Sequence, residues 1–221
     1  MFFSKITLTK DFDTVIKLDA YKQKTGYYYH QILWDLFSEN NPDKKRDFIY
    51  HVQLVNQWPT FYIVSATEPV DTKEIWHIQS KPFNPQICVH ETLHFKLRAN
   101  PRICRKEGEQ KKHFDIVQDI WFKNADKIKS NLISKNELMQ TAGEKWLKQK
   151  AVSQNGFKVD TVIVDNFQKE IFKKKNHSIS FSTLDFTGKL IVTDPGLFIR
   201  TLAQGIGSAK GFGCGLLMVK R

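Results

Sequence analysis

The sequence has little of what builds a disulfide framework, a zinc knuckle or a membrane span. Its three cysteines, Cys88, Cys104 and Cys214, are an odd number without a CxxC pair, which favours a protein of the reducing cytoplasm. No apolar run approaches the roughly 18 residues that a membrane span needs. Lys5 and Lys10 follow only a short apolar start, so we expect no signal peptide and no membrane partner.

Acidic residues are scarce relative to basic ones. The 221 residues hold 34 Lys plus Arg against 23 Asp plus Glu, a formal net charge of +11. A basic surface releases counterions from phosphates, so nucleic acid is the expected partner, with an anionic membrane or mere solubility as alternatives. The hydrophobic fraction of 41% is enough for a globular core.

The first eighty residues predict a small α+β domain. Phe2 to Leu8 predict a strand, and Tyr21 to Phe37 predict a helix with a buried stripe at Tyr29, Ile32 and Leu33 that continues to Leu36 and Phe37. Alternating residues predict a hairpin and a returning strand. These further strands are expected at 48–54, 61–66 and 76–79.

Two prolines in Lys81 to Pro85 exclude a helix or a central strand and predict a linker. We therefore expect an N-terminal domain over residues 1–80, a linker over 81–90 and a C-terminal domain over 91–221. The second domain opens with a strand in which Leu93, Phe95 and Leu97 alternate with basic residues. Residues 102–136 are polar and rich in lysine, without a clear pattern.

The rest of the second half repeats the order of the first. A helix is predicted from Lys135 to Gln154, and Asp194 with Pro195 predicts the capped start of another. Strands are predicted at 161–165, 170–173, 179–185, 189–192 and 216–220. Both halves thus follow the split βαβ pattern, so the expected fold class is α+β, with two tandem ferredoxin-like βαββαβ domains.

His30 is the first candidate for chemistry. At about 100° per residue, Tyr27, His30 and Trp34 share a helix face that differs from the buried stripe. Imidazole titrates near neutral pH, so His30 suits proton transfer at a phosphate, with Tyr27 one turn away. The alternative is a solvent-facing histidine among aromatic residues that dock the helix.

The segment Gly205 to Gly215 predicts an unusual loop before the last strand. Glycine permits positive φ and lets backbone N–H groups approach an anion, and Lys210 adds charge. The loop lacks the pattern of a Walker or dinucleotide motif. We expect it to contact RNA through Gly205, Gly207, Gly211 and Gly213, and a tight structural turn is the alternative.

Other basic residues are candidates for RNA contacts. Lys173, Lys174 and Lys175 lie between two predicted strands, where a hairpin tip would reach phosphates, although charge runs are often only solvated surface. The same question arises for Lys111 and Lys112 with Arg102, Arg105 and Lys106. Lys96 and Arg98, on the basic face of the strand that begins at Leu93, are also expected to contact RNA.

A metal site is a weaker candidate. Cys88, His90 and His94 invite it, but in an extended strand the two histidines would stand roughly 13 Å apart. No pair of acidic residues has the pattern of a two-metal nuclease site. We therefore expect chemistry without a metal or another cofactor.

Five segments, in this order, resemble the CasE type of CRISPR repeat-processing endoribonucleases, part of the RAMP superfamily. They are Tyr27–His30, Ser80–Pro85, Phe95–Pro101, Gly188–Pro195 and Gly205–Leu217. The resemblance is nearly full length, but residues 102–136 are longer than the usual family segment.

The resemblance implies two ferredoxin-like domains and metal-independent cutting of a CRISPR repeat stem-loop in precursor RNA. It implies that His30 is catalytic, that Tyr27 assists and that Lys173 to Lys175 meet the RNA stem. It also implies attack by the RNA's own 2′-hydroxyl, so DNA should resist cutting, and delivery of the retained product to other Cascade subunits. Which proton His30 moves is left open.

Two other functions remain at this point. One is a tandem RNA-binding protein without catalytic activity, in which His30 only contacts RNA. The other is a metal-dependent nuclease that uses Cys88, His90 and His94, whose activity EDTA would abolish.

Overall fold

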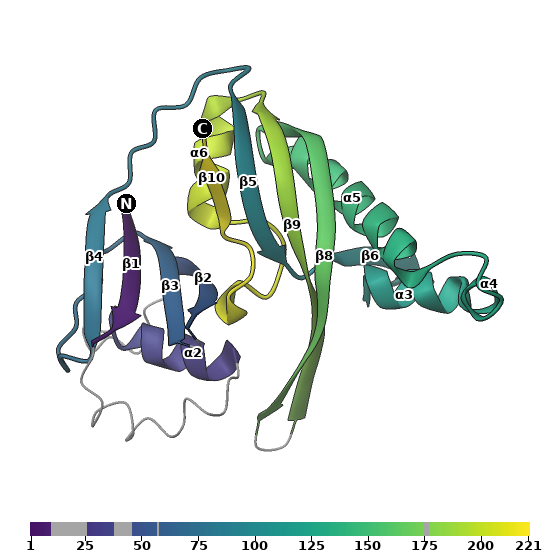
Figure 1. The fold of residues 1–221 in the computed structure, drawn as a ribbon, viewed down its shortest axis with the longest axis horizontal. Coiled ribbons are helices and arrows are strands. Elements are labelled where there is room, and N and C mark those ends of the chain that lie inside the picture. Colours follow the sequence, from purple (N-terminus) through teal and green to yellow (C-terminus); the bar gives the residue numbers. More distant parts are fainter. Residues whose placement is uncertain (10–25, 38–45, 57, 175–176) are drawn as a thin grey trace.

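The structure is a computed structural model of the 221-residue chain and describes residues 1–9, 26–37, 46–56, 58–174 and 177–221. Two four-stranded sheets lie side by side (Figure 1). All strand pairs in both sheets are antiparallel. Both sheets have the strand order of a ferredoxin-like domain, which confirms the predicted fold class. No described helix combines the length and the apolar character that crossing a bilayer requires.

The first sheet has the strand order β2-β3-β1-β4. Helix α2 (Gly26–Trp34) crosses one face, where Tyr29 and Leu33 are buried as their spacing predicts. Residues 66–75 join β3 to β4 without a helix, so this half lacks the second helix of the expected order. β4 continues to Pro82, inside the expected linker, since an edge strand tolerates a residue that cannot donate to the ladder. The strands are β1 (Phe2–Leu8), β2 (Phe48–Val55), β3 (Trp58–Ser65) and β4 (Trp76–Pro82).

The second sheet has the order β10-β5-β9-β8, and α5 (Lys135–Gln154) and α6 (Pro195–Gln204) pack on one face. Its central strand β5 (Thr92–Ala99) alternates as predicted. Phe95 and Leu97 are buried in the core, and Lys96 is exposed on the other side. The remaining strands are β8 (Phe157–Lys174), β9 (His177–Val192) and β10 (Leu217–Lys220).

The predicted helix boundaries in the second half are confirmed, because their capping residues do what their types favour. Ser134 and Glu137 form a capping box at the start of α5. The Asp194 carboxylate accepts a hydrogen bond from the Leu197 N–H at 2.9 Å, and Pro195 takes the first helical position of α6.

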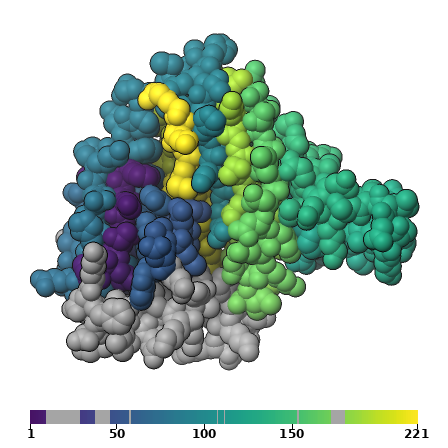
Figure 2. Space-filling model, viewed as in Figure 1, coloured from purple at the N-terminus to yellow at the C-terminus, as the bar shows by residue number. Residues whose placement is uncertain are grey.

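Two segments differ from the prediction. The four short strands expected between residues 161 and 192 are two long strands, because bulges at Val159/Thr161 and Asp165/Gln168 break the alternation without ending the pairing. Residues 102–136, for which the sequence predicted no elements before Lys135, form a hairpin and two short helices. The second helix lies at the end of the projection on the right of Figure 2, whereas Ile116 and Val117 of the first are buried in the core of the second sheet. These elements are β6 (Arg102–Glu107), β7 (Gln110–Asp115), α3 (Ile116–Lys123) and α4 (Ala125–Lys129).

The two sheets meet where β2 faces the glycine-rich loop after α6. The Tyr50 hydroxyl of β2 donates a hydrogen bond to the Gly211 carbonyl oxygen at 3.1 Å. Nearby, Arg98 donates two hydrogen bonds, of 2.7 and 2.8 Å, to the Asp185 carboxylate. Burial and then the charge of Arg98 lower the pKa of His51 on β2 to about 4. This histidine is therefore neutral at the junction.

Gly188 of β9 is a position where the second sheet has no room for a side chain. A Cβ there would overlap the backbone carbonyl oxygen of Thr161 on β8. We expect Gly188→Ala to lower the free energy of unfolding by about 2 kcal/mol or more, measured by urea denaturation.

Gly196→Ala is the matched control. Its Cβ would meet only the Asp194 carboxylate, at 3.4 Å, and alanine favours a helix over glycine by roughly 0.5–1 kcal/mol. Its free energy of unfolding should be unchanged or slightly higher. Equal losses in the two variants would contradict the packing described for β8 and β9.

Candidate functional site

His30 lies on α2 at the point where this helix meets the glycine-rich loop of the second sheet. Its ring centroid is 5.6 Å from that of Trp34 and 6.2 Å from that of Phe48. The ring is half-buried, and its Nδ1 atom is buried without a hydrogen-bond partner among the described residues. His30 is thus only partly solvent-facing, and its contacts with Trp34 and Phe48 also fit the alternative of a histidine among aromatic residues that dock the helix.

The glycine-rich loop approaches His30 through a single turn of 3₁₀ helix, η2 (Lys210–Phe212). A Cβ on Gly211 would lie 2.7 Å from Nη1 of Arg46 and 3.8 Å from Cε1 and Nδ1 of His30. A side chain here would therefore require the Arg46 guanidinium to move, but it would be in ordinary van der Waals contact with the His30 ring. The hydrogen bond from Tyr50 to the Gly211 carbonyl holds the loop at this distance.

Arg46 is the residue of this site that sequence reasoning missed. It lies two residues before β2, and its Nε atom is buried without a hydrogen-bond partner in the described part of the chain. Its charge acts on both neighbours, lowering the pKa of His30 and that of Lys210. Nothing in the local sequence marks it, because its partners come from α2 and from a loop near the other end of the chain.

The electrostatics of this cluster suit an anionic substrate. Burial lowers the pKa of His30 below its ordinary value, and the positive charge of Arg46 lowers it further. The imidazole is therefore neutral near pH 7 and able to accept a proton. Arg46 remains protonated at any physiological pH and places one cation beside that imidazole, while Lys210 lies in the adjoining loop and its pKa is lowered by burial and then by Arg46.

The other predicted residues are divided among several places. Tyr27 is on α2 with His30, but its side chain lies outside the described part. The same holds for the side chains of Lys173 and Lys174 at the end of β8, and Lys175 lies outside the described residues altogether.

Three further candidates lie at or near the junction between the sheets. Arg98 is held in its ion pair with Asp185, and Lys96 is exposed on the same strand. Gly213 packs beside Tyr50, where a Cβ would lie 3.2 Å from the tyrosine ring.

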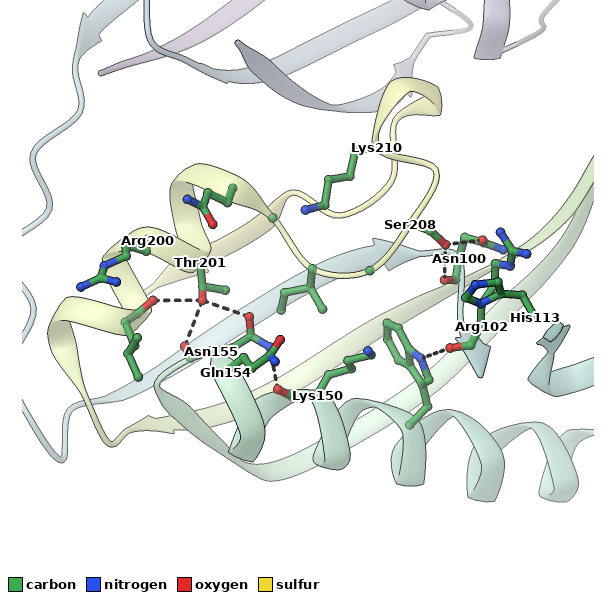
Figure 3. Close-up of a pocket in the computed structure, with 16 residues that line it drawn as sticks. Asn100, Arg102, His113, Lys150, Gln154, Asn155, Arg200, Thr201, Ser208 and Lys210 are labelled. Carbon is green, nitrogen blue, oxygen red and sulfur yellow. Dashed lines mark hydrogen bonds between the residues drawn. The ribbon is translucent and has the colours of Figure 1, made fainter. Parts of the chain in front are cut away.

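The remaining candidates line a cavity on the α5 and α6 side of the glycine-rich loop, shown in Figure 3. They are Arg102, Gly205, Gly207 and Lys210.

The metal candidates do not come together. Within the described residues, no group of three or more His, Cys, Asp or Glu side chains is placed to hold a metal ion. All three cysteines are free, with Cys88 and Cys104 exposed and Cys214 buried. Cys88, His90 and His94 therefore do not form the predicted alternative site.

Comparison with known proteins agrees with this architecture over the whole chain. A family model described as CRISPR associated protein matches residues 1–221. The chain is 33% identical, over 193 residues, to the CRISPR system Cascade subunit CasE of Escherichia coli (strain K12), covering 86% of this chain and 89% of that protein.

Two Thermus thermophilus comparisons point the same way. The chain is 26% identical over 180 residues to the CRISPR-associated endoribonuclease Cse3 of this organism, covering 73% of this chain and 72% of that protein. The fold also matches a solved structure of Thermus thermophilus Cse3 bound to an RNA that represents a pre-cleavage complex, with a TM-score of 0.70 at 20% identity over 100% of this chain and 98% of that one. The chain thus belongs to the CRISPR associated protein family, in its CasE type.

Proposed function

We propose that this protein is a metal-independent endoribonuclease that binds the stem-loop of a CRISPR repeat and cuts precursor CRISPR RNA. The observation that carries the proposal is the cluster of a half-buried, unpartnered His30 imidazole, the Arg46 guanidinium and the Gly211 backbone. Such a cluster offers a neutral base and a fixed cation within one site. The names of its relatives, a Cascade subunit and a CRISPR-associated endoribonuclease, support the same activity.

The RNA supplies its own nucleophile in this mechanism. The 2′-oxygen of the ribose attacks the adjacent phosphorus while His30 takes the 2′-proton. The bond to the 5′-oxygen of the next nucleotide breaks, leaving a 2′,3′-cyclic phosphate and, once that oxygen is protonated, a 5′-hydroxyl. The lowered pKa of His30 favours the role of base over that of acid. DNA lacks the nucleophile and is not cut.

Arg46 and Lys210 stabilise the negative charge that grows on the phosphate oxygens in the transition state. A preorganised cation in a partly buried site is worth far more than one in water, because it needs no reorganisation during the reaction. The ammonium group of Lys210 is partly withdrawn from solvent, and this burial lowers its pKa.

The remaining assignments come from the family resemblance. Tyr27, one turn before His30, assists the chemistry, and the basic run Lys173 to Lys175 meets the RNA stem. The cut repeat stays bound and is passed with the protein to other Cascade subunits in the cytoplasm. No metal or other cofactor takes part.

We expect His30→Ala to reduce the rate of cutting of a repeat hairpin by about 10²-fold to 10⁴-fold, because it removes the proton acceptor. The dissociation constant for the hairpin should stay within a few-fold of wild type. The measurement is single-turnover cleavage on a gel, with and without EDTA, beside a filter-binding assay.

The same gel separates the alternatives. Wild type should cut equally well in EDTA, and it should not cut a hairpin with a 2′-deoxy sugar before the cleavage position. Cutting that EDTA abolishes would point to a metal enzyme. Binding without cutting by wild type would point to a non-catalytic RNA-binding protein.

The pH dependence follows from the direction of the His30 pKa shift. Because the base must be deprotonated, the second-order rate constant for cutting should be flat above about pH 6.5 and fall only below that value. Arg46→Gln should move this acid limb to higher pH, since it removes a positive charge beside the imidazole. It should also slow cutting by about 10²-fold.

Lys73→Gln is the matched control for the loss of one positive charge. Lys73 is an exposed residue paired with Asp35, and it is not among the groups that shift the pKa of His30, so its loss should change neither the rate nor the pH profile. An acid limb that moves to lower pH in Arg46→Gln, or does not move, would argue against a direct effect of Arg46 on His30.

A further inference from the structure

A second basic site lies on the other side of the glycine-rich loop. It is a cavity of about 530 Å³ between the C-terminal ends of α5 and α6, and the loop closes its third side (Figure 3). Four cations line it, and the described residues of its wall include no Asp or Glu. The four are Arg102 from β6, Lys150 from α5, Arg200 from α6 and Lys210 from the loop.

Some basic residues elsewhere in the described chain are paired with carboxylates. Arg98, Arg105, Lys123, Lys148 and Arg221 each form an ion pair with a carboxylate. None of the four cavity cations has such a partner among the described residues. Four like charges around one cavity repel each other, so the arrangement favours an anionic ligand.

The cavity also offers groups that suit a nucleobase. Trp146 and Ile206 are buried in its floor, and Leu197 adds an exposed apolar side chain. The side-chain amides of Gln154 and Gln204 are exposed and make no hydrogen bond to a described residue. Its volume falls in the roughly 300–1,000 Å³ range of small-ligand sites. The cations suit a phosphate, the apolar surface suits a base, and the amides suit the edge of that base. Together they match a nucleotide in a single strand, whose base edges are free.

The loop connects this cavity to the site around His30. Lys210 reaches from the loop toward the cavity, and the next residue, Gly211, packs against Arg46 and His30. A single strand that leaves the scissile phosphate therefore has a cation-lined path along the same loop.

We propose that this cavity binds single-stranded RNA that flanks the repeat hairpin next to the cleavage position, through its phosphates and one base. This inference rests on the proposed function and adds a subsite to it. Lys150 and Arg200 are the new phosphate ligands.

The test compares three versions of one repeat hairpin: trimmed to its stem, extended on the 5′ side and extended on the 3′ side. A 2′-deoxy sugar before the mapped cleavage position prevents cutting. Dissociation constants come from fluorescence anisotropy at several salt concentrations. The protein is wild type, the double variant Lys150→Ala with Arg200→Ala, or the control double variant Lys145→Ala with Lys148→Ala, which removes two charges from α5 outside the cavity.

Wild type should bind one of the extended hairpins about tenfold or more tighter than the trimmed one. The Lys150/Arg200 variant should lose this advantage yet bind the trimmed hairpin as wild type does. Its salt dependence on the extended RNA should weaken by about 1.4 in slope, for two single-strand phosphate contacts. The control variant should keep the advantage, and free AMP should not compete.

Affinity for RNA, rather than thermal stability, is the readout. An extension advantage that survives in the Lys150/Arg200 variant, an equal loss for trimmed and extended RNA, or displacement by free AMP would overturn the inference alone. A wild-type protein that binds no hairpin would overturn it together with the proposed function.

Discussion

The site depends on one contact between the two sheets, the approach of the glycine-rich loop to α2 and β2. The hydrogen bond from Tyr50 to the Gly211 carbonyl and the absence of a side chain at Gly211 bring loop and helix within van der Waals distance. Neither sheet holds the site by itself. His30 and Arg46 come from the first half of the chain and Lys210 from the second, so the proposed chemistry would require the correct docking of both.

Much of the fold follows from local rules in the sequence. The helix at residues 135–154 and the start of α6 at Asp194 are predicted because capping residues act on their immediate neighbours. The position of His30 off the buried stripe follows from helical periodicity alone. Its half-burial does not follow, because Phe48 and the loop that cover it belong to other elements.

The parts that sequence reasoning missed all depend on distant partners. The long hairpin of β8 and β9 appears as four strands because bulges reset the alternation. Arg46 carries no local signal, since its neighbours His30 and Gly211 are joined to it only by the fold. The cations Lys150 and Arg200 look like ordinary solvated helix residues until the fold brings them together with Arg102 and Lys210 around one cavity. The net charge of +11 predicts a polyanionic partner, whereas the positions of the basic residues in the fold predict where that partner binds.

The most direct measurement of the central claim is a crystal structure of the protein with a repeat hairpin whose 2′-hydroxyl at the cleavage position has been removed. We predict that the scissile phosphate lies between the His30 imidazole and the Arg46 guanidinium. The sugar carbon that would carry the nucleophile should face the imidazole, and the guanidinium should be about 2.7–3.2 Å from a phosphate oxygen. A bound hairpin whose backbone stays away from both side chains would contradict it.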